Sequence, residues 1–400
     1  MVNIERVMKN LHTIGEIGAV ENKGITREGF SKEYYNALDK LENLFKKSSL
    51  EITKDRVGNI IGKRKGKKID GKSILIGSHL DTVKNGGLYD GLLGVISALE
   101  VVNVLNDLNI ETNNPIEIVA FNAEEGSEMG GTFGSRVLTG RQSLEEKGLS
   151  EKLSHYNLTL EDIIASQKDM SKVNTFLELH IEQGGFLVEN NLDIGIVNGI
   201  VGITRYEIEI IGESNHAGTT PMTLRKDPIK ILGKFIEKIN NLSQEFAHPF
   251  VVTIGDIKVS PGMYNVIPEK VKFLLELRDL NQENIEIFMK RLKDFSEEFT
   301  DFETNFLLTI NKPSKLLTDE IIKFIEKSAK ELEYKNIIMS SGAGHDAKEL
   351  IYKVPTGMIF IPSVGGISHS PKELSTENQI EKGIEVLLKT VLKLDKEVYV

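Results

Sequence analysis

Hydrophobic residues in this chain form either continuous runs or helically spaced patterns. Continuous apolar runs at 73–78, 116–122, 175–179 and 357–361 are typical of strands buried on both faces of a sheet. A helical pattern near 91–107 lies between the first two runs. Strands of this kind, separated by helices, predict a largely parallel sheet that helices cover on both faces.

The two ends of the chain add further elements. Residues 3–47 predict two amphipathic helices separated by a turn near Gly24, and residues 50–66 predict a hairpin. Near the C-terminus, Thr376 and Gln379 have the spacing of a capping box, which predicts a helix with apolar spacing through Val391.

The pattern changes between about 205 and 315. Alternating residues at 206–210 predict a half-exposed strand, after which we expect helix, strand, strand, helix and strand. These lie at 226–243, 251–259, 271–278, 283–298 and 305–311. The β-α-β-β-α-β order is typical of a ferredoxin-like module. We therefore predict an α/β protein with two domains: a discontinuous domain, 1–204 with 316–400, that holds the mainly parallel sheet, and an inserted domain, 205–315.

Composition narrows the class of protein. The chain has 400 residues, of which 40% are hydrophobic and 27% charged, as in ordinary globular proteins. A net charge of −10 argues against nucleic-acid binding, which needs a basic surface. No window reaches the roughly 18 apolar residues of a membrane span, and the first residues lack the apolar core of a signal peptide. Cysteine is absent, which excludes disulfides and thiolate metal sites. We expect a cytoplasmic protein that binds neither nucleic acid nor membrane.

Five side chains suited to metal binding follow or end the predicted strands. His79 and His180 stand at the ends of two strands, Glu125 and His369 follow two others, and Asp90 lies in a turn before a helix. Functional side chains gather at the carboxyl ends of strands in open α/β sheets. A single histidine in such a place is more often structural, but five nitrogen and oxygen donors suit two ions that share a bridging carboxylate. Asp90 is the expected bridge, while the pairing of histidines with ions stays open.

Two more carboxylates are candidates for roles beside the metals. Adjacent loop residues can point apart, so we assign Glu125 to a metal and Glu124 to the general base that takes a proton from water. Asp81 lies two residues beyond His79, on the same side of an extended segment, and is expected to orient that imidazole. The alternatives are two solvated glutamates and, for Asp81, a turn or helix cap.

Seven motifs resemble those of one enzyme family. They are 77–83 (GSHLDTV), 86–91 (GGLYDG), 124–127 (EEGS), 178–184 (ELHIEQG), 216–222 (HAGTTPM), 341–347 (SGAGHDA) and 365–370 (GGISHS). Over nearly its whole length the chain resembles the hydantoinase/carbamoylase branch of the two-metal amidohydrolases related to aminoacylases and carboxypeptidase G. This branch includes N-carbamoyl-L-amino-acid hydrolases, allantoate amidohydrolases and β-ureidopropionases. The chain departs from the family pattern at Gly185, where proline is common, and at Glu128, where arginine is common.

The resemblance implies a homodimer with two divalent ions per subunit, for which zinc, manganese, cobalt or nickel are candidates. It implies that Glu124 is the catalytic base and that His216, in the inserted lid and dimerisation domain, stabilises the oxyanion in the partner subunit's active site. Substrate contacts are implied for Arg278, Asn265, Gln183, His216 and Gly344, with Arg278 binding a substrate carboxylate. As alternatives, His216 is a surface turn residue, and Arg278 pairs with Glu276 or Asp279.

The predicted reaction is hydrolysis of a C–N bond in a linear amide. The preferred substrate is an N-carbamoyl-L-amino acid, a small molecule with a carboxylate, which would yield the L-amino acid, carbon dioxide and ammonia. Glu124 would take a proton from water and return it to the leaving amine. Allantoate amidohydrolase and an aminoacylase or peptidase-like hydrolase are the alternatives within this class. A non-catalytic binding protein on the same fold is the alternative outside it, against which the complete set of donors argues.

Overall fold

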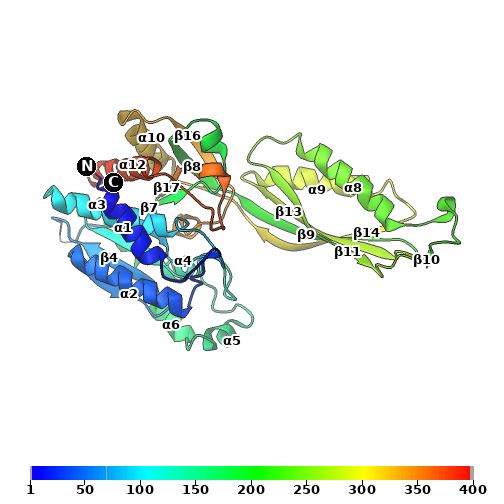
Figure 1. Cartoon of the computed structure of the whole chain (residues 1–400), viewed down its shortest axis with the longest axis horizontal. Coiled ribbons are helices and arrows are strands. Elements are labelled where there is room, and N and C mark those ends of the chain that lie inside the picture. Colours follow the sequence, from blue (N-terminus) through cyan, green and yellow to red (C-terminus); the bar gives the residue numbers. More distant parts are fainter. Residues whose placement is uncertain (1, 69, 397–400) are drawn as a thin grey trace. The chain divides into compact units, whose positions relative to one another are not determined.

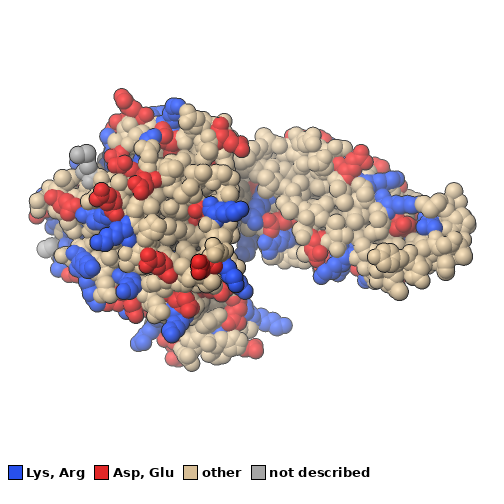
Figure 2. Space-filling model, viewed as in Figure 1, with Lys and Arg blue, Asp and Glu red and all other residues tan. Residues whose placement is uncertain are grey.

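The computed structural model describes residues 2–68 and 70–396, which form two compact units (Figure 1). Unit 2 comprises Gly199–Leu316, and unit 1 is the rest of the described chain. The sequence placed these two boundaries at 205 and 315. Acidic and basic side chains are interspersed on the visible face of each unit (Figure 2). Among the described residues, no helix is long and apolar enough to cross a membrane.

The larger sheet has nine strands in the part of the chain that the structure describes. Its order is β15-β8-β17-β7-β5-β6-β4-β3, and β16 also pairs with β8. The strands are β3 (Glu51–Lys54), β4 (Ile60–Arg64), β5 (Ser73–His79), β6 (Ile116–Phe121), β7 (Val173–Ile181), β8 (Ile194–Ile200), β15 (Lys315–Leu316), β16 (Asn336–Ser341) and β17 (Thr356–Ile361). The central neighbours β17, β7, β5 and β6 are parallel. Strands β8, β4 and β3 pair antiparallel beside them. The predicted α/β class with a large, mainly parallel sheet is confirmed.

Helices cover this sheet, and two of them, α3 and α12, approach it closely at a glycine. Helix α3 is buried along most of its length, and a Cβ on its Gly94 would lie 2.4 Å from the carbonyl oxygen of Leu179 in β7. Gly383 brings α12 equally close to Ile361 of β17. The helices are α1 (Ile4–Gly15), α2 (Lys32–Lys47), α3 (Leu92–Asp107), α4 (Phe133–Leu138), α5 (Leu149–Ser154), α6 (Leu160–Ala165), α7 (Phe186–Glu189), α10 (Asp319–Glu331), α11 (Ala347–Leu350) and α12 (Glu377–Lys396). Two short strands, β1 (Ala19–Val20) and β2 (Gly24–Ile25), pair between α1 and α2.

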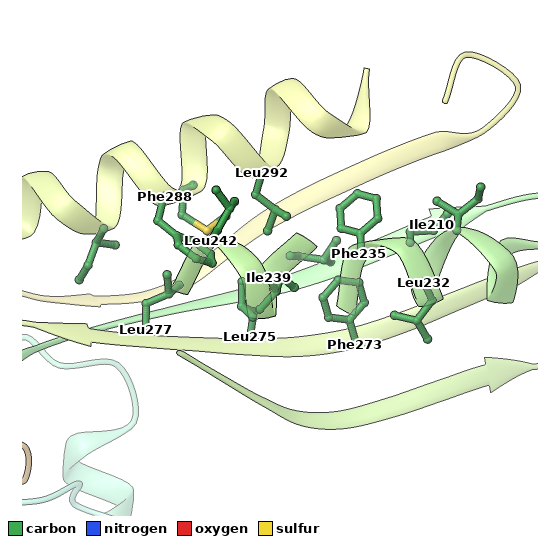
Figure 3. Packing of buried hydrophobic residues seen from close by; sticks show 14 of the residues in the cluster. Ile210, Leu232, Phe235, Ile239, Leu242, Phe273, Leu275, Leu277, Phe288 and Leu292 are labelled. Carbon is green, nitrogen blue, oxygen red and sulfur yellow. The ribbon is translucent and has the colours of Figure 1, made fainter. Parts of the chain in front are cut away.

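Unit 2 contains a four-stranded antiparallel sheet in the order β11-β13-β9-β14. Its six main elements follow one another in the predicted order, strand, helix, strand, strand, helix and strand. A pair of short strands, β10 and β12, is present in addition. The elements are β9 (Gly202–Ile211), β10 (Asn215–His216), α8 (Pro228–Ser243), β11 (Val251–Ser260), β12 (Val266–Ile267), β13 (Lys270–Asp279), α9 (Gln282–Ser296) and β14 (Glu303–Lys312). Alternate residues of β13, among them Phe273 and Leu275, pack against Phe235 of α8 and Phe288 of α9 (Figure 3). This alternation is what one covered face of a sheet requires.

Candidate metal centre

The candidate metal ligands gather at the carboxyl ends of the four central parallel strands. His79 is the last residue of β5, and His180 is the penultimate residue of β7, which continues to Ile181. Glu125 and His369 lie in the segments that follow β6 and β17. Because these strands are parallel, their carboxyl ends lie on one edge of the sheet, the usual place for functional side chains.

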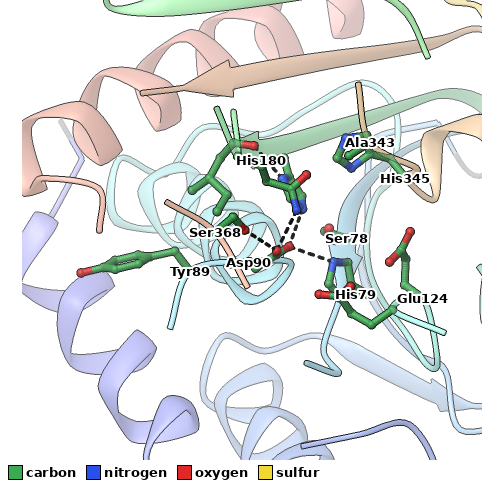
Figure 4. Close-up of polar contacts among 12 residues, drawn as sticks. Ser78, His79, Tyr89, Asp90, Glu124, His180, Ala343, His345 and Ser368 are labelled. Atoms are coloured by element: carbon green, nitrogen blue, oxygen red, sulfur yellow. Dashed lines mark hydrogen bonds and ion pairs between the residues drawn. The ribbon is translucent and has the colours of Figure 1, made fainter. Parts of the chain in front are cut away.

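Two imidazoles face the same oxygen of Asp90 (Figure 4). Oδ1 of Asp90 lies 3.4 Å from Nε2 of His79 and 3.0 Å from Nε2 of His180. The Nδ1 atoms lie 3.0 Å from the carbonyl oxygen of Asp81 for His79 and 2.8 Å from that of Ile181 for His180. A carbonyl oxygen only accepts, so both Nδ1 atoms carry a proton and both Nε2 atoms are presented to the carboxylate. Two imidazole nitrogens and a carboxylate oxygen in this arrangement form a donor set for a cation.

A second donor group forms around the other oxygen of Asp90. Nε2 of His369 lies 3.3 Å from Oδ2 of Asp90 and 3.3 Å from Oε2 of Glu125. The second oxygen of Glu125, Oε1, is buried and has no hydrogen-bond partner among the described residues. In both groups, the ligand atoms lie within 4.8 Å of one another. Asp90 belongs to both groups, which therefore fit two cations that share a bridging carboxylate.

Electrostatics at this centre favour positive charge. Burial opposes the ionisation of Asp90, but hydrogen-bond contacts with His180, His369 and His79 hold its pKa well below the usual value. Contacts with Asp90 and then Glu125 raise the pKa of His369 to about 10. Burial opposes protonation of His79 and His180, yet Asp90 raises the pKa of both. Metal cations in place of the protons on these imidazoles would be held by the same nitrogen and carboxylate oxygen atoms.

Glu124 lies beside the first group and is held by its main chain. The carboxylate of Asp81 accepts the N–H of Glu124 and that of Glu125, each at 3.1 Å. Burial raises the pKa of Glu124 well above its usual value, against the effect of His79 and with that of Glu125. The sequence predicted that the Asp81 carboxylate orients His79. In the structure the carbonyl oxygen of Asp81 has the shorter contact with that ring, and the carboxylate oxygen is 3.7 Å away.

The main chain is in the left-handed region at several positions of this centre. Gly91 has φ +66, and a Cβ there would lie 2.3 Å from the imidazole of His79, so only glycine can follow Asp90. Ala123, Gln183 and His369 have φ +54, +62 and +53. Non-glycine residues in this region cost about 1–3 kcal/mol each and cluster at functional sites.

Residues 75–393 match the family described as peptidase family M20/M25/M40. The chain belongs to this family. It is 37% identical to the N-carbamoyl-L-amino acid amidohydrolase of Geobacillus stearothermophilus, across 98% of this chain and 99% of that protein. It is 32% identical to the allantoate amidohydrolase of Bacillus subtilis, across 95% of each. Among solved structures, an amidase of the hydantoinase/carbamoylase family from Burkholderia multivorans has a TM-score of 0.90 and 30% identity, across 99% of this chain and 98% of that one. The predicted resemblance and enzyme class are confirmed.

The M20-family chain also carries buried polar residues beside the candidate ligands that the sequence analysis missed. Glu178 accepts hydrogen bonds from Ser78 Oγ at 2.7 Å and from the N–H of Ala347 at 3.0 Å. His345 is also buried, the centroid of its ring lies 4.6 Å from that of His180, and burial lowers its pKa well below the usual value. The sequence contained a signal for Glu178: it lies two residues before His180 in the same strand, and side chains at i and i+2 of a strand share a face.

Gln183 and Gly344, both predicted to contact substrate, lie in unit 1. Nε2 of Gln183 donates to Oδ2 of Asp90 at 2.8 Å, so this amide reaches the candidate metal centre directly. Gly344 is exposed, and a Cβ at this position would meet nothing within 4 Å. The loop after β16 is therefore open at Gly344.

The other predicted substrate residues of this M20-family chain lie in unit 2. His216 is exposed in β10, and its Nδ1 accepts the N–H of Gly218 at 3.0 Å and of Thr219 at 3.2 Å. The carbonyl oxygen of Asn265 accepts the N–H of Ala217 at 3.0 Å, which places Asn265 beside the His216 turn. Arg278 pairs with Glu276 at 2.8 Å, which is one of the alternatives that the sequence left open.

Proposed function

We propose that this M20-family chain is a metal-dependent amidohydrolase whose substrate is an N-carbamoyl-L-amino acid. Water cleaves the ureido group, and the products are the L-amino acid, carbon dioxide and ammonia. The observation that carries the proposal is the pair of donor groups that share Asp90 beside the buried Glu124, in a chain similar over its full length to proteins with this activity in their names.

Two divalent ions are part of the proposal. His79, Asp90 and His180 would hold one ion, and Asp90, Glu125 and His369 the other. Zinc, manganese, cobalt or nickel in these places would polarise the ureido carbonyl and lower the pKa of a water molecule.

Glu124 serves as the base and acid. Its carboxylate takes a proton from the attacking water and returns that proton to the nitrogen that becomes the amine of the product. A carboxyl group whose pKa is raised by burial is suited to hold a proton between these two steps near neutral pH. Asp81 supports both steps because its carboxylate holds the main chain of Glu124.

Unit 2 supplies the oxyanion donor and the grip on the substrate carboxylate. We interpret it as a ferredoxin-like lid and dimerisation domain in a cytoplasmic homodimer, with His216 acting in the partner subunit's site. Because Nδ1 of His216 accepts two N–H groups, its neutral ring carries the proton on Nε2, which is the donor an oxyanion needs. Arg278 would exchange its contact with Glu276 for the substrate carboxylate, which suits its planar fork.

Three further contacts complete the proposed substrate site. Gln183 would donate from its amide, Asn265 would contact substrate from the turn beside His216, and Gly344 would offer its main chain. The amide of Gln183 now donates to Asp90, so it can contact substrate only after a metal ion has taken its place at that carboxylate. Metal binding would thereby release the Gln183 side chain for substrate.

Allantoate is the second candidate substrate, since relatives named allantoate amidohydrolase match 95% or more of the chain. Both substrates carry a ureido group and a carboxylate, so the donor set serves either. The test is an assay of ammonia and free amine, with each of the four metals. N-carbamoyl-L-amino acids, their D-enantiomers, allantoate and N-acetyl amino acids would be compared. We expect the highest kcat/KM for an N-carbamoyl-L-amino acid. A higher value for allantoate or for an N-acetyl amino acid would replace that assignment, and no turnover of any would favour a binding protein.

A further inference from the structure

Glu373 is a buried carboxylate with partners in two separate segments. It is 6% exposed, and its Oε1 accepts the N–H of Tyr89 at 2.8 Å and that of Asp90 at 3.0 Å. Its Oε2 lies 3.0 Å from the hydroxyl of Ser368. One side chain therefore contacts the main chain of the bridging residue and the residue that precedes His369.

The segments that contain Asp90 and Glu373 are far apart in the sequence and lie together only in the folded chain. Glu373 and Asp90 are 283 positions apart; one segment enters α3 after β5, and the other follows β17. The hydroxyl of Ser368 also lies 3.0 Å from Oδ2 of Asp90, a contact drawn in Figure 4. Since a hydroxyl has one proton, Ser368 donates to one of these two carboxylates at a time.

The turn before Asp90 is shaped around Glu373. A Cβ added to Gly87 would lie 2.3 Å from Oε1 of Glu373 and 2.5 Å from its Cβ. Any side chain at position 87 would therefore displace Glu373, so the absence of one is what allows this carboxylate to reach Tyr89 and Asp90.

We propose that Glu373 is a positioning residue that fixes the bridging carboxylate of Asp90 relative to the segment that carries His369. This inference rests on the metal centre of the proposed function. Oδ1 of Asp90 must face the donor group of His79 and His180, and Oδ2 must face the donor group of Glu125 and His369. A small rotation of the main chain at Asp90 would misplace both oxygens, and groups that orient metal ligands commonly contribute about 10–100-fold to metal affinity.

Two substitutions of Glu373 distinguish an effect of its hydrogen bonds from an effect of its negative charge. In Glu373→Gln the remaining oxygen can accept both N–H groups, and the new NH2 can donate to Ser368, which is then free to donate to Asp90. Glu373→Ala removes all of these contacts. A role in orientation predicts that glutamine preserves metal affinity and alanine does not.

Asp395 offers a matched control in the same unit. It is 7% exposed, and its carboxylate accepts the N–H groups of the consecutive residues Asn113 at 2.9 Å and Asn114 at 2.8 Å. It therefore repeats the bonding of Glu373 without contacting any candidate ligand. Asp395→Ala should lower the thermal midpoint as Glu373→Ala does and leave metal affinity unchanged.

The experiment measures zinc affinity by chelator competition on the full chain, together with hydrogen exchange of the Tyr89 and Asp90 amides in the metal-free protein. We expect Glu373→Ala to weaken zinc binding about 10–100-fold and to speed hydrogen exchange at both amides, and we expect Glu373→Gln to stay close to wild type. If the alanine variant does not fold, Glu373→Asp, which is too short to reach both segments, is expected to show the same loss.

The outcomes are distinguishable. Wild type that binds no zinc would overturn the proposed function. Two ions bound as tightly by Glu373→Ala (or, if that variant does not fold, by Glu373→Asp) as by wild type would overturn only the role of Glu373. An equal loss in Asp395→Ala would show general destabilisation rather than positioning.

Discussion

The carboxylate of Asp81 accepts the main-chain N–H of Glu124 at 3.1 Å. The same carboxylate accepts the N–H of Glu125, so one buried side chain holds the predicted base and a predicted ligand together. The loop after β6 is thereby tied to the loop after β5, and the distance between base and metal donors depends on Asp81.

Asp81→Asn should lower both stability and turnover. The amide keeps one acceptor and turns an NH2 toward a buried N–H, and an unsatisfied buried donor costs about 1–3 kcal/mol. Urea unfolding of the metal-free protein measures the first effect, and kcat measures the second. Asp169→Asn is the control, because that carboxylate accepts the N–H of Ser171 at the surface. Equal unfolding free energies for Asp81→Asn and wild type would contradict the assigned contacts.

Glu124→Gln should separate chemistry from metal binding. Glutamine has nearly the same shape but cannot take a proton, so kcat should fall by about 10²–10⁴-fold while metal content stays at the wild-type value. Elemental analysis and turnover on the same sample check both parts. Glu125→Gln is the paired variant and should lose metal as well as activity. Near-normal turnover of Glu124→Gln would show that another group is the base.

Removal of single ligands should reveal the shared role of Asp90. His369→Ala affects only the group of Asp90, Glu125 and His369, so one ion per chain should remain. Asp90→Ala removes an oxygen from both groups, and both ions should be lost. Metal content after dialysis against metal-free buffer measures each stoichiometry. Retention of two ions by Asp90→Ala would exclude a bridging carboxylate.

The sequence predicted the candidate ligands because local patterns place them. Apolar runs end at His79 and near His180, and parallel strands bring their carboxyl ends to one edge, so these side chains had to meet. The sequence pattern did not predict strand β8, because Gly195, Asn198 and Gly199 interrupt its run of apolar residues.

The residues that hold the centre in place were less accessible to prediction. Glu373 acts on Asp90 across 283 positions, and no periodicity within one element encodes such a contact. Arg27 is a cation in a loop, for which exposure is the normal expectation, yet it is fully buried. Both depend on how separate segments pack, which a single sequence does not reveal.

Metal affinity should increase with pH, because His369 must lose a proton before it can bind a metal ion. Contact with Asp90, then with Glu125, raises the pKa of this imidazole to about 10, so the metal-free protein holds it protonated at neutral pH. A metal ion binds only the neutral ring, and binding must release that proton. Apparent affinity should therefore rise with pH up to about 10. Calorimetry in buffers of different ionisation enthalpy counts the protons; uptake without proton release at pH 7 would contradict this assignment.

Arg27→Met should destabilise unit 1 and, through the segment of Asp81, reduce turnover. The guanidinium of Arg27 is fully buried and donates to the carbonyl oxygen of Leu80 at 2.8 Å and to that of Ile17 at 3.1 Å. Burial lowers its pKa to about 10, although Asp81 opposes the shift. Methionine fills similar space but leaves the buried carbonyl oxygen of Leu80 without this donor, at about 1–3 kcal/mol, and also removes the donor to the partly buried carbonyl oxygen of Ile17. Urea unfolding of the metal-free protein and kcat measure the two effects.

The exposed Arg56 provides the control for that substitution. Arg56→Met removes a guanidinium from the surface, where substitutions usually change stability by less than about 0.5 kcal/mol. Because the main chain of Arg27 also pairs with Thr82, a displaced Arg27 loop should shift the 80–82 segment and with it the hold of Asp81 on Glu124. Arg27→Met should therefore lower kcat more than it changes KM. A variant as stable and as active as Arg56→Met would show that the buried cation is dispensable to this segment.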